Sequence, residues 1–247
     1  RRLLDYLNGA NKSQGATSLA NFSSKSRGME REVIICGASC RFPAGANDPQ
    51  TFMDMMRGCV PFLQPIPASW KVSLGVQVAG FLDDNAAETF DQAFFHIGAK
   101  EAAQMDPHQR ILLEICYEAL NDACLLEVKE TCSIGVFVGL CNNEWVANRQ
   151  DDGVTAYTSV CTAQSAAANR VSYILGLTGP SMVIDTACSS SLAAIHIAIQ
   201  SLLAGDCDAA IVAAADLLIS PYSLMVSCTC TFLYFVCSSV FVFCNII

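Results

Sequence analysis

One segment of the chain places a cysteine between a predicted strand and a predicted helix. Ser181 to Ile184 is a short run rich in apolar residues, and Leu192 to Leu203 is a long apolar run that is closed by Gly205. Cys188 lies between the two runs. The segment therefore predicts a strand, a turn and a helix, with Cys188 in the turn close to the helix start.

The rest of the chain alternates short apolar runs with segments of helix length. Four strands and two helices are predicted, at 33–36, 135–139, 182–184, 210–214, 107–123 and 189–203. Asp106 can cap the start of the helix at 107–123, where Pro107 needs no N–H partner. Its inward face is predicted to carry Ile111, Leu112, Ile115, Ala119 and Leu120. This mixture predicts an α/β layered fold.

A cysteine at a helix start is a candidate nucleophile. The first backbone N–H groups of a helix have no partner within it, and the helix dipole is positive there, so a thiolate is favoured. The alternative is that Cys188 is small apolar filler, because cysteine is often buried and this chain contains 14 of them. Position alone leaves both interpretations open.

The residues around Cys188 resemble the active-site signature of a known enzyme family. DTACSSSL, at 185–192, is similar to the signature of the ketosynthase domain of type I polyketide synthases and related fatty acid synthases. Seven other blocks follow in that family's order: GASCRFP, GFLDD, FDQAFFHI, EAAQMDPHQRILLE, GVFVG, ANRVSYILGLTGPS and GDCDAAIVA. The chain is identified as the N-terminal half of a beta-ketoacyl synthase domain, with the resemblance running from Glu32 to about Cys228.

The resemblance implies a thiolase-like fold. Such a fold has two similar halves stacked in a layered αβαβα architecture, and this chain covers the first half. In the family the strand that leads to the nucleophile, here around Ser181 to Asp185, pairs with its twin across a two-fold axis. A homodimer of the intact domain is therefore implied.

The resemblance also implies a decarboxylative Claisen condensation. An acyl group passes from the phosphopantetheine arm of an acyl carrier protein to Cys188, and a malonyl extender then loses CO2 and attacks the thioester. No cofactor or metal is expected on the domain itself, and the implied partners are the carrier and other synthase domains of a longer chain. The Cys188 N–H can serve as one oxyanion donor, while the family's second donor comes from a Phe loop near the C-terminus.

Two histidines complete the family's chemistry, within motifs that read HGTGT and KSNIGH in the second half. Neither motif occurs in this sequence, so the chain alone is expected not to complete a condensation. Of its three histidines, His96 is predicted to be a surface or packing residue, and the helix start explains His108. His196 is predicted to be a hydrogen-bonded core histidine. None is assigned a catalytic role.

Charge and cysteine content restrict the partners and the cellular compartment that the sequence predicts. A net charge of −9 and the lack of a basic run argue against a nucleic-acid partner. The cysteines follow no evident secretory signal, which favours a reducing compartment, cytoplasmic with a plastid as the alternative. The close pairs Cys36/Cys40 and Cys228/Cys230 are expected to be incidental core thiols rather than zinc ligands.

Three segments are predicted: a flexible linker or upstream-domain tail at 1–28, with a short helix near 3–7, the ketosynthase half at 29–228, and an aberrant apolar tail at 229–247. Three interpretations of the tail stay open: translation beyond a mispredicted exon boundary or frameshift, a membrane anchor, or a variant of the fold. The alternative function is a truncated, non-catalytic remnant that dimerises or docks a carrier, with association to a membrane left open.

Overall fold

The computed structural model describes residues 32–70, 77–83, 88–141, 144–145, 153–221 and 237–246. Five strands form one mixed sheet in the order β1-β7-β6-β4-β5. Their bounds are Glu32–Arg41 for β1, Ile134–Gly139 for β4, Ser181–Ile184 for β5, Ala209–Asp216 for β6 and Cys237–Ile246 for β7. β4 is parallel to β5 and β6, whereas β7 is antiparallel to β1 and β6. The four predicted strands are confirmed, and the one at 33–36 is part of the longer β1.

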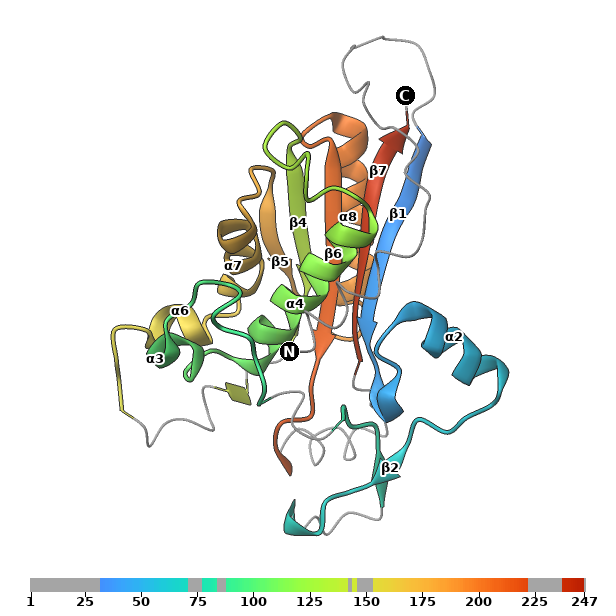
Figure 1. The fold of residues 1–247 in the computed structure, drawn as a ribbon, viewed down its shortest axis with the longest axis vertical. Coiled ribbons are helices and arrows are strands. Elements are labelled where there is room, and N and C mark those ends of the chain that lie inside the picture. Colours follow the sequence, from blue (N-terminus) through green and yellow to red (C-terminus); the bar gives the residue numbers. More distant parts are fainter. Residues whose placement is uncertain are drawn as a thin grey trace.

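Helices cover both faces of this sheet (Figure 1). The main helices are α4 (Pro107–Asp122), α7 (Ala166–Leu175) and α8 (Ser190–Ala204). The smaller elements are η1 (Pro43–Gly45), α2 (Pro49–Arg57), β2 (Gln64–Pro65), η2 (Ala68–Trp70), β3 (Val78–Ala79), α3 (Ala99–Ala102) and α6 (Thr158–Thr162). α4 and α7 pack on one face and α8 on the other. The predicted α/β layers and both predicted helices are confirmed.

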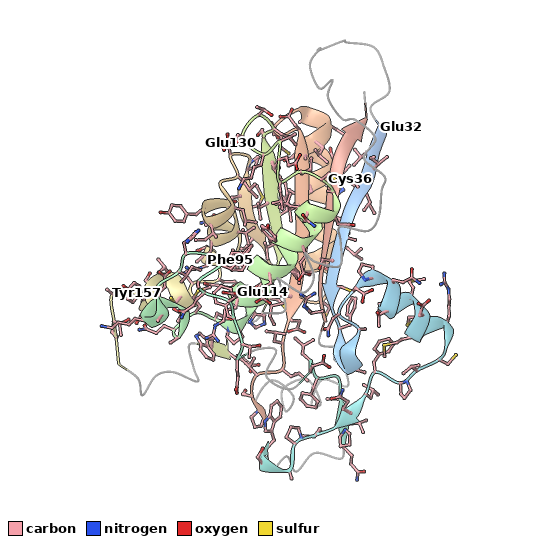
Figure 2. All side chains as sticks on the ribbon, in the orientation of Figure 1. Glu32, Cys36, Phe95, Glu114, Glu130 and Tyr157 are labelled. Atoms are coloured by element: carbon pink, nitrogen blue, oxygen red, sulfur yellow. The ribbon has the colours of Figure 1, made fainter. Side chains whose placement is uncertain are left out.

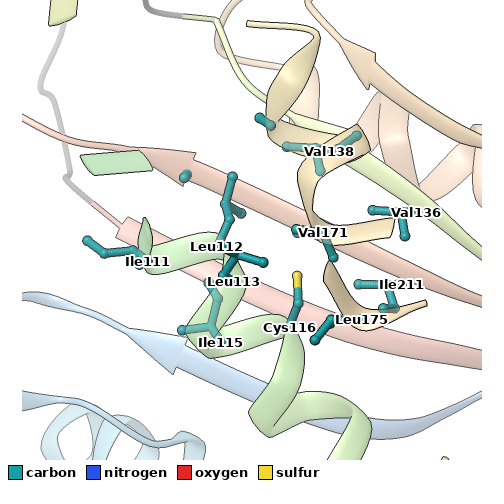
Figure 3. Close-up of a cluster of buried hydrophobic side chains, with 14 of the residues drawn as sticks. Ile111, Leu112, Leu113, Ile115, Cys116, Val136, Val138, Val171, Leu175 and Ile211 are labelled. Carbon is teal, nitrogen blue, oxygen red and sulfur yellow. The ribbon is translucent and has the colours of Figure 1, made fainter. Parts of the chain in front are cut away.

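Side chains of the central strands alternate between two apolar clusters. Val136 and Val138 of β4 face the cluster under α4 and α7, whereas Phe137 faces α8. Figure 3 shows the first cluster, where Leu112 and Cys116 of α4 and Val171 of α7 lie over the sheet. Strands buried on both faces are uniformly apolar, which explains why β4 is recognisable from its sequence.

The start of α4 forms as the sequence predicts. The Asp106 carboxylate accepts a hydrogen bond from the His108 N–H at 2.8 Å, and Pro107 occupies the first turn. The predicted inward face is confirmed, because all of its members are buried: Ile111, Leu112, Ile115, Ala119 and Leu120.

An aromatic group fixes the segment before α3 against α4. The ring of Phe95, which is labelled in Figure 2, stacks on Phe90 with centroids 5.4 Å apart and meets Phe94 and Tyr117 edge-on. Tyr117 belongs to α4. Edge-on and stacked rings add to the stabilisation from burial alone, so this group holds the neighbouring segment in place.

A buried ion pair joins β1 to α4. The Glu118 carboxylate accepts hydrogen bonds from the Ser39 hydroxyl at 2.6 Å and from both terminal nitrogens of Arg41. The Glu118 and Arg41 side chains are 2% and 13% exposed. Burial alone would lower the pKa of Arg41, but the hydrogen bonds and charge of Glu118 raise it above its ordinary value. The guanidinium therefore stays charged inside the protein.

Strand β7 lies within the predicted apolar tail. It pairs with β1 from Glu32↔Ile246 to Arg41↔Ser238, and with β6 from Ala209↔Cys244 to Asp216↔Cys237. This segment is a sheet strand and not the spanning helix that a membrane anchor requires. The linker at 1–28 with its short helix, and the pair Cys228/Cys230, fall outside the described residues. The segment boundaries remain predictions.

Helix α8 rests on the sheet by one face only. Ala194, Ala198 and Leu202 are fully buried against it, whereas Leu192 is 70% exposed and Leu203 is 41% exposed. The window Ala187–Ala204 is long and apolar enough to cross a membrane, judged by length and composition alone. Because one face is seated on the sheet, α8 fits better as a packed helix with an uncovered apolar side.

Candidate active site around Cys188

The carboxyl ends of β4 and β5 meet at one edge of the sheet. Gly139 of β4 is the register partner of Ile184 of β5, and the Leu140 N–H donates to the Ile184 carbonyl at 3.2 Å. Open α/β sheets bind ligands beyond the carboxyl ends of their parallel strands. The residues that directly follow these two strands are therefore the candidates for a site.

The turn after β5 is closed by its own side chains. The Ser190 hydroxyl accepts from the Thr186 N–H at 2.9 Å and donates to the Ala187 carbonyl at 2.6 Å. The Ser189 hydroxyl donates to the Thr186 carbonyl at 2.8 Å, and the Asp185 carboxylate accepts from the Ala187 N–H at 3.0 Å. Short polar side chains stabilise turns in this way. The polar residues of DTACSS therefore hold the turn in shape, apart from any role in chemistry.

The residue before Cys188 adopts a left-handed conformation. Ala187 has φ of +54°, which is uncommon for a residue that carries a Cβ. Such conformations concentrate at functional sites and persist where the surrounding contacts hold them. Here the hydrogen bonds to the Ala187 N–H and carbonyl hold the turn.

Cys188 is exposed at this turn, two residues before α8 begins at Ser190. The predicted position between a strand and a helix start is confirmed, and the filler interpretation is disfavoured because the side chain is not buried. A sulfur at this point lies near the first backbone N–H groups of a helix, which favour developing negative charge. The arrangement suits a nucleophile that attacks a carbonyl carbon.

A glycine on the neighbouring strand allows α8 to start close to the sheet. A Cβ at Gly139 would lie 2.8 Å from the Ser190 carbonyl carbon and from the Ser191 N. Because both atoms are backbone, any side chain at this position would push the start of α8 away. Gly139 thus lets the turn that carries Cys188 lie close to the end of β4.

A second thiol follows β4 toward the same edge. Cys141 is half-buried and lies two residues after the end of β4. Burial raises the pKa of its thiol to about 11, and the charges of Asp216, Asp185 and Cys188 act in the same direction. Sequence reasoning missed Cys141, although the predicted strand at 135–139 ends just before it.

Full or partial burial makes four further thiols less reactive than an exposed thiol. Burial raises the pKa of Cys40 to about 12 and that of Cys207 to about 11. Burial also raises the pKa of Cys132 to about 11 and that of Cys116 further. Since the thiolate is the nucleophile, these four thiols resist reaction with reagents in solution. Cys40 is buried as predicted, while Cys36 is only half-buried on β1 (Figure 2).

The three histidines serve other roles. His108 is buried, and its Nε2 accepts from the Leu217 N–H at 3.2 Å, so its Nδ1 donates to the Asp106 carboxylate at 2.7 Å. It therefore links the start of α4 to the chain after β6, beyond the role in the helix start that was predicted. His96 is exposed, in agreement with a surface residue. The prediction for His196 was wrong, because its side chain is exposed on α8.

Among the described residues, no three His, Cys, Asp or Glu side chains gather closely enough to hold a metal ion. The groups that follow β4 and β5 are the thiols of Cys141 and Cys188 and the backbone donors of the turn. Both lie beyond the carboxyl ends of the parallel strands.

The mixed sheet with helices on both faces, and a cysteine exposed at a strand-to-helix turn, define one half of a thiolase-like fold. The family model for the beta-ketoacyl synthase N-terminal domain matches residues 30–234. The chain belongs to the beta-ketoacyl synthase family. The resemblance predicted from its motifs is confirmed.

Curated relatives are large synthases. The chain is 38% identical over 209 residues to the highly reducing polyketide synthase ACTTS3 of Alternaria alternata, which covers 78% of this chain and 8% of that protein. It is 34% identical over 234 residues to the lovastatin nonaketide synthase mokA of Monascus pilosus, which covers 87% of this chain and 8% of that protein. The chain thus spans less than a tenth of the length of these relatives.

Solved structures give the same family. The oxazolomycin ketosynthase domain OzmH KS7 of Streptomyces albus JA3453 matches with a TM-score of 0.77 and 26% identity, over 87% of this chain and 42% of that one. The ketosynthase from module 6 of the bacillaene synthase of Bacillus subtilis 168 matches with a TM-score of 0.75 and 30% identity. The match covers 86% of this chain and 40% of that one. The chain therefore covers less than half of each solved ketosynthase.

Proposed function

We propose that this chain is the acyl-accepting half of a polyketide synthase ketosynthase domain, and that Cys188 carries the growing acyl group as a thioester. The observation that supports this most directly is the exposure of Cys188 on a fixed turn before α8. An acyl carrier protein of a larger synthase would deliver the group on its phosphopantetheine arm, as the family relation suggests.

The proposed step is a thioester exchange. The Cys188 sulfur attacks the carbonyl carbon of the carrier thioester, a tetrahedral oxyanion forms, and the carrier thiol leaves as the new thioester is made. Backbone N–H groups at the turn can donate to the oxyanion, the Cys188 N–H first among them. In the family, condensation with the malonyl extender then uses histidines of the second half.

The uncovered side of α8 supports this assignment to a first half. Leu192 and Leu203 leave apolar area in water, which costs about 25 cal/mol for each Å². In a thiolase-like fold the two similar halves stack on one another. We propose that the second half of the domain covers this side of α8.

The exchange can be tested with the chain alone. The protein is incubated with a short acyl thioester of N-acetylcysteamine, which copies the end of the phosphopantetheine arm, and the acylated peptides are mapped by mass spectrometry. Cys188 is expected to be acylated about tenfold or more over Cys59 and Cys124, because thiolate character and access set thiol reactivity.

Cys59 and Cys124 are the matched controls, since both are exposed like Cys188 but lie away from the strand ends. In the Cys188→Ala variant, total acylation should fall to the amount found on Cys59 and Cys124. Equal labelling of all three cysteines would instead favour a non-catalytic remnant that only dimerises or docks a carrier.

We also propose that β5 is a dimer edge. Among the described residues, β5 pairs with β4 only. The Pro180 carbonyl accepts from Val136 of β4, and the Ile184 carbonyl accepts from Leu140 directly after β4. Ser181 and Val183 therefore direct their backbone groups to the open edge. An open strand edge is a template for pairing with a second copy, here across a two-fold axis.

Substitution at this edge should separate the copies. Val183→Pro removes an outward N–H without touching the β4 side, so a smaller sedimentation coefficient and an unchanged circular dichroism spectrum are expected. Val183→Ala keeps the N–H and should sediment like the unsubstituted protein. A Val183→Pro protein that still sediments as a dimer would rule out pairing through β5.

A further inference from the structure

Cys141 and Cys188 leave the sheet from adjacent positions. Their strands are register partners at Gly139↔Ile184, and the Leu140 N–H donates to the Ile184 carbonyl just before Cys141. Neighbouring strands lie about 4.8 Å apart. Two cysteines can be bridged when their Cα atoms are about 4.4 to 6.8 Å apart, and the spacing of the two strands from which these residues continue falls within that range.

The close approach of α8 keeps the two chains together after the strands end. Gly139 lets the backbone of Ser190 and Ser191, just after Cys188, pack closely against the end of β4. The charge of Cys188 acts on the Cys141 thiol, as do the carboxylates of Asp185 and Asp216. These groups therefore share one small region at the sheet edge.

The two thiols differ in a way that sets an order of reaction. Peroxides react with exposed thiolates, and Cys188 is exposed near a helix start. Cys141 is half-buried and its raised pKa keeps it as a thiol, so it resists direct oxidation. When Cys141 reacts in turn, its proton passes to the departing hydroxyl.

We propose that Cys141 is a resolving cysteine, which forms a reversible disulfide with Cys188 when a hydroperoxide oxidises the nucleophile. The disulfide would block acyl loading and shield Cys188 from irreversible oxidation. The blocking role rests on the proposed function, whereas the disulfide itself does not.

The chemistry balances in two steps. In the first, the Cys188 sulfur attacks one peroxide oxygen, the O–O bond breaks, and water leaves as Cys188 becomes a sulfenic acid. In the second, the Cys141 sulfur attacks the Cys188 sulfur, the S–S bond forms and the S–O bond breaks. The hydroxyl leaves with the Cys141 proton as a second water, and a thiol reductant restores both cysteines.

The test uses hydrogen peroxide as the probe. The full chain is oxidised, remaining thiols are alkylated, and a non-reduced digest is searched for linked peptides. A Cys141–Cys188 link is expected as the main product, and dithiothreitol should return nearly all alkylatable thiol at Cys188. This map needs no variant, so it stands even if a substitution disturbs folding.

Variants then separate the resolving role from general oxidation. In Cys141→Ser, Cys188 should proceed to sulfinic acid, and dithiothreitol should no longer restore its thiol. Cys132→Ser is the matched control, since Cys132 is also half-buried with a pKa raised to about 11, and it should behave like the unsubstituted chain. Sulfinic acid formed equally in both variants, or a link to another cysteine, would overturn the proposal.

The acyl-loading assay keeps the two proposals apart. A chain that acylates at Cys188 but forms no link to Cys141 would overturn only the resolving role. A chain that forms the link but accepts no acyl group at Cys188 would overturn only the proposed function. Acylation that persists after all of the protein carries the Cys141–Cys188 disulfide would show that the disulfide does not block acyl loading.

Discussion

A chain cut after Pro221 is expected to lose cooperative unfolding altogether. The cut removes β7, which is paired on both sides, and leaves β1 without a strand partner among the described residues. Each lost backbone hydrogen bond contributes about 1 kcal/mol, and the total stability of a domain is only about 5–15 kcal/mol. Loss of a central strand therefore exceeds what the rest can supply. Thermal unfolding followed by circular dichroism would show a flat trace in place of a transition.

Two further variants sharpen this experiment. Deletion of 1–28, the predicted linker, shortens the chain by a similar length and is expected to leave the melting transition unchanged. Val240→Pro places a residue without an N–H opposite Ser39 and Ala213, within a central strand, and should cost about 3 kcal/mol or more. A cut chain that melts as sharply as the intact one would show that β7 carries no stability.

Glu118→Gln is expected to destabilise the protein by about 3 kcal/mol, because it leaves the Arg41 guanidinium buried without its counter-charge. In either orientation the new amide would also turn its N–H₂ toward a terminal nitrogen of Arg41, which can only donate. The measurement is the midpoint of urea unfolding, converted to free energy at constant slope.

An exposed ion pair provides the control. Asp54 and Arg57 are 3.3 Å apart on α2, with 58% and 69% of their side chains exposed, so Asp54→Asn should change stability by about 0.5 kcal/mol or less. A joint Arg41→Met and Glu118→Leu exchange should recover most of the loss from Glu118→Gln, since it removes both charges. Equal effects of Glu118→Gln and Asp54→Asn would contradict a buried, energetically important pair.

Features set by neighbours along the chain could be predicted from the sequence. The Asp106 cap on α4 and the turn at Cys188 are local, and their residues carry the signal within a few positions. The strands β4 and β6 were predictable because burial on both faces demands an unbroken apolar run.

Features set by distant pairing could not be predicted in this way. Nothing near Cys237–Ile246 in the sequence indicates that it pairs with β1 and β6, so the apolar composition alone predicts an aberrant tail. The link from Glu118 to Arg41 and the meeting of Cys141 with the Cys188 turn both depend on sheet register. His196 was misplaced because α8 is apolar on most of its surface, which hides which side faces the sheet.

The position of β7 also sets the order in which the fold can close during synthesis. β1 emerges first, yet its only strand partner among the described residues is β7, the last of the described strands. Until then the open edge of β1, with Ile35 on it, is available to other chains. The sheet therefore closes late on the ribosome, and crowded expression should favour aggregates seeded at β1 over mature protein.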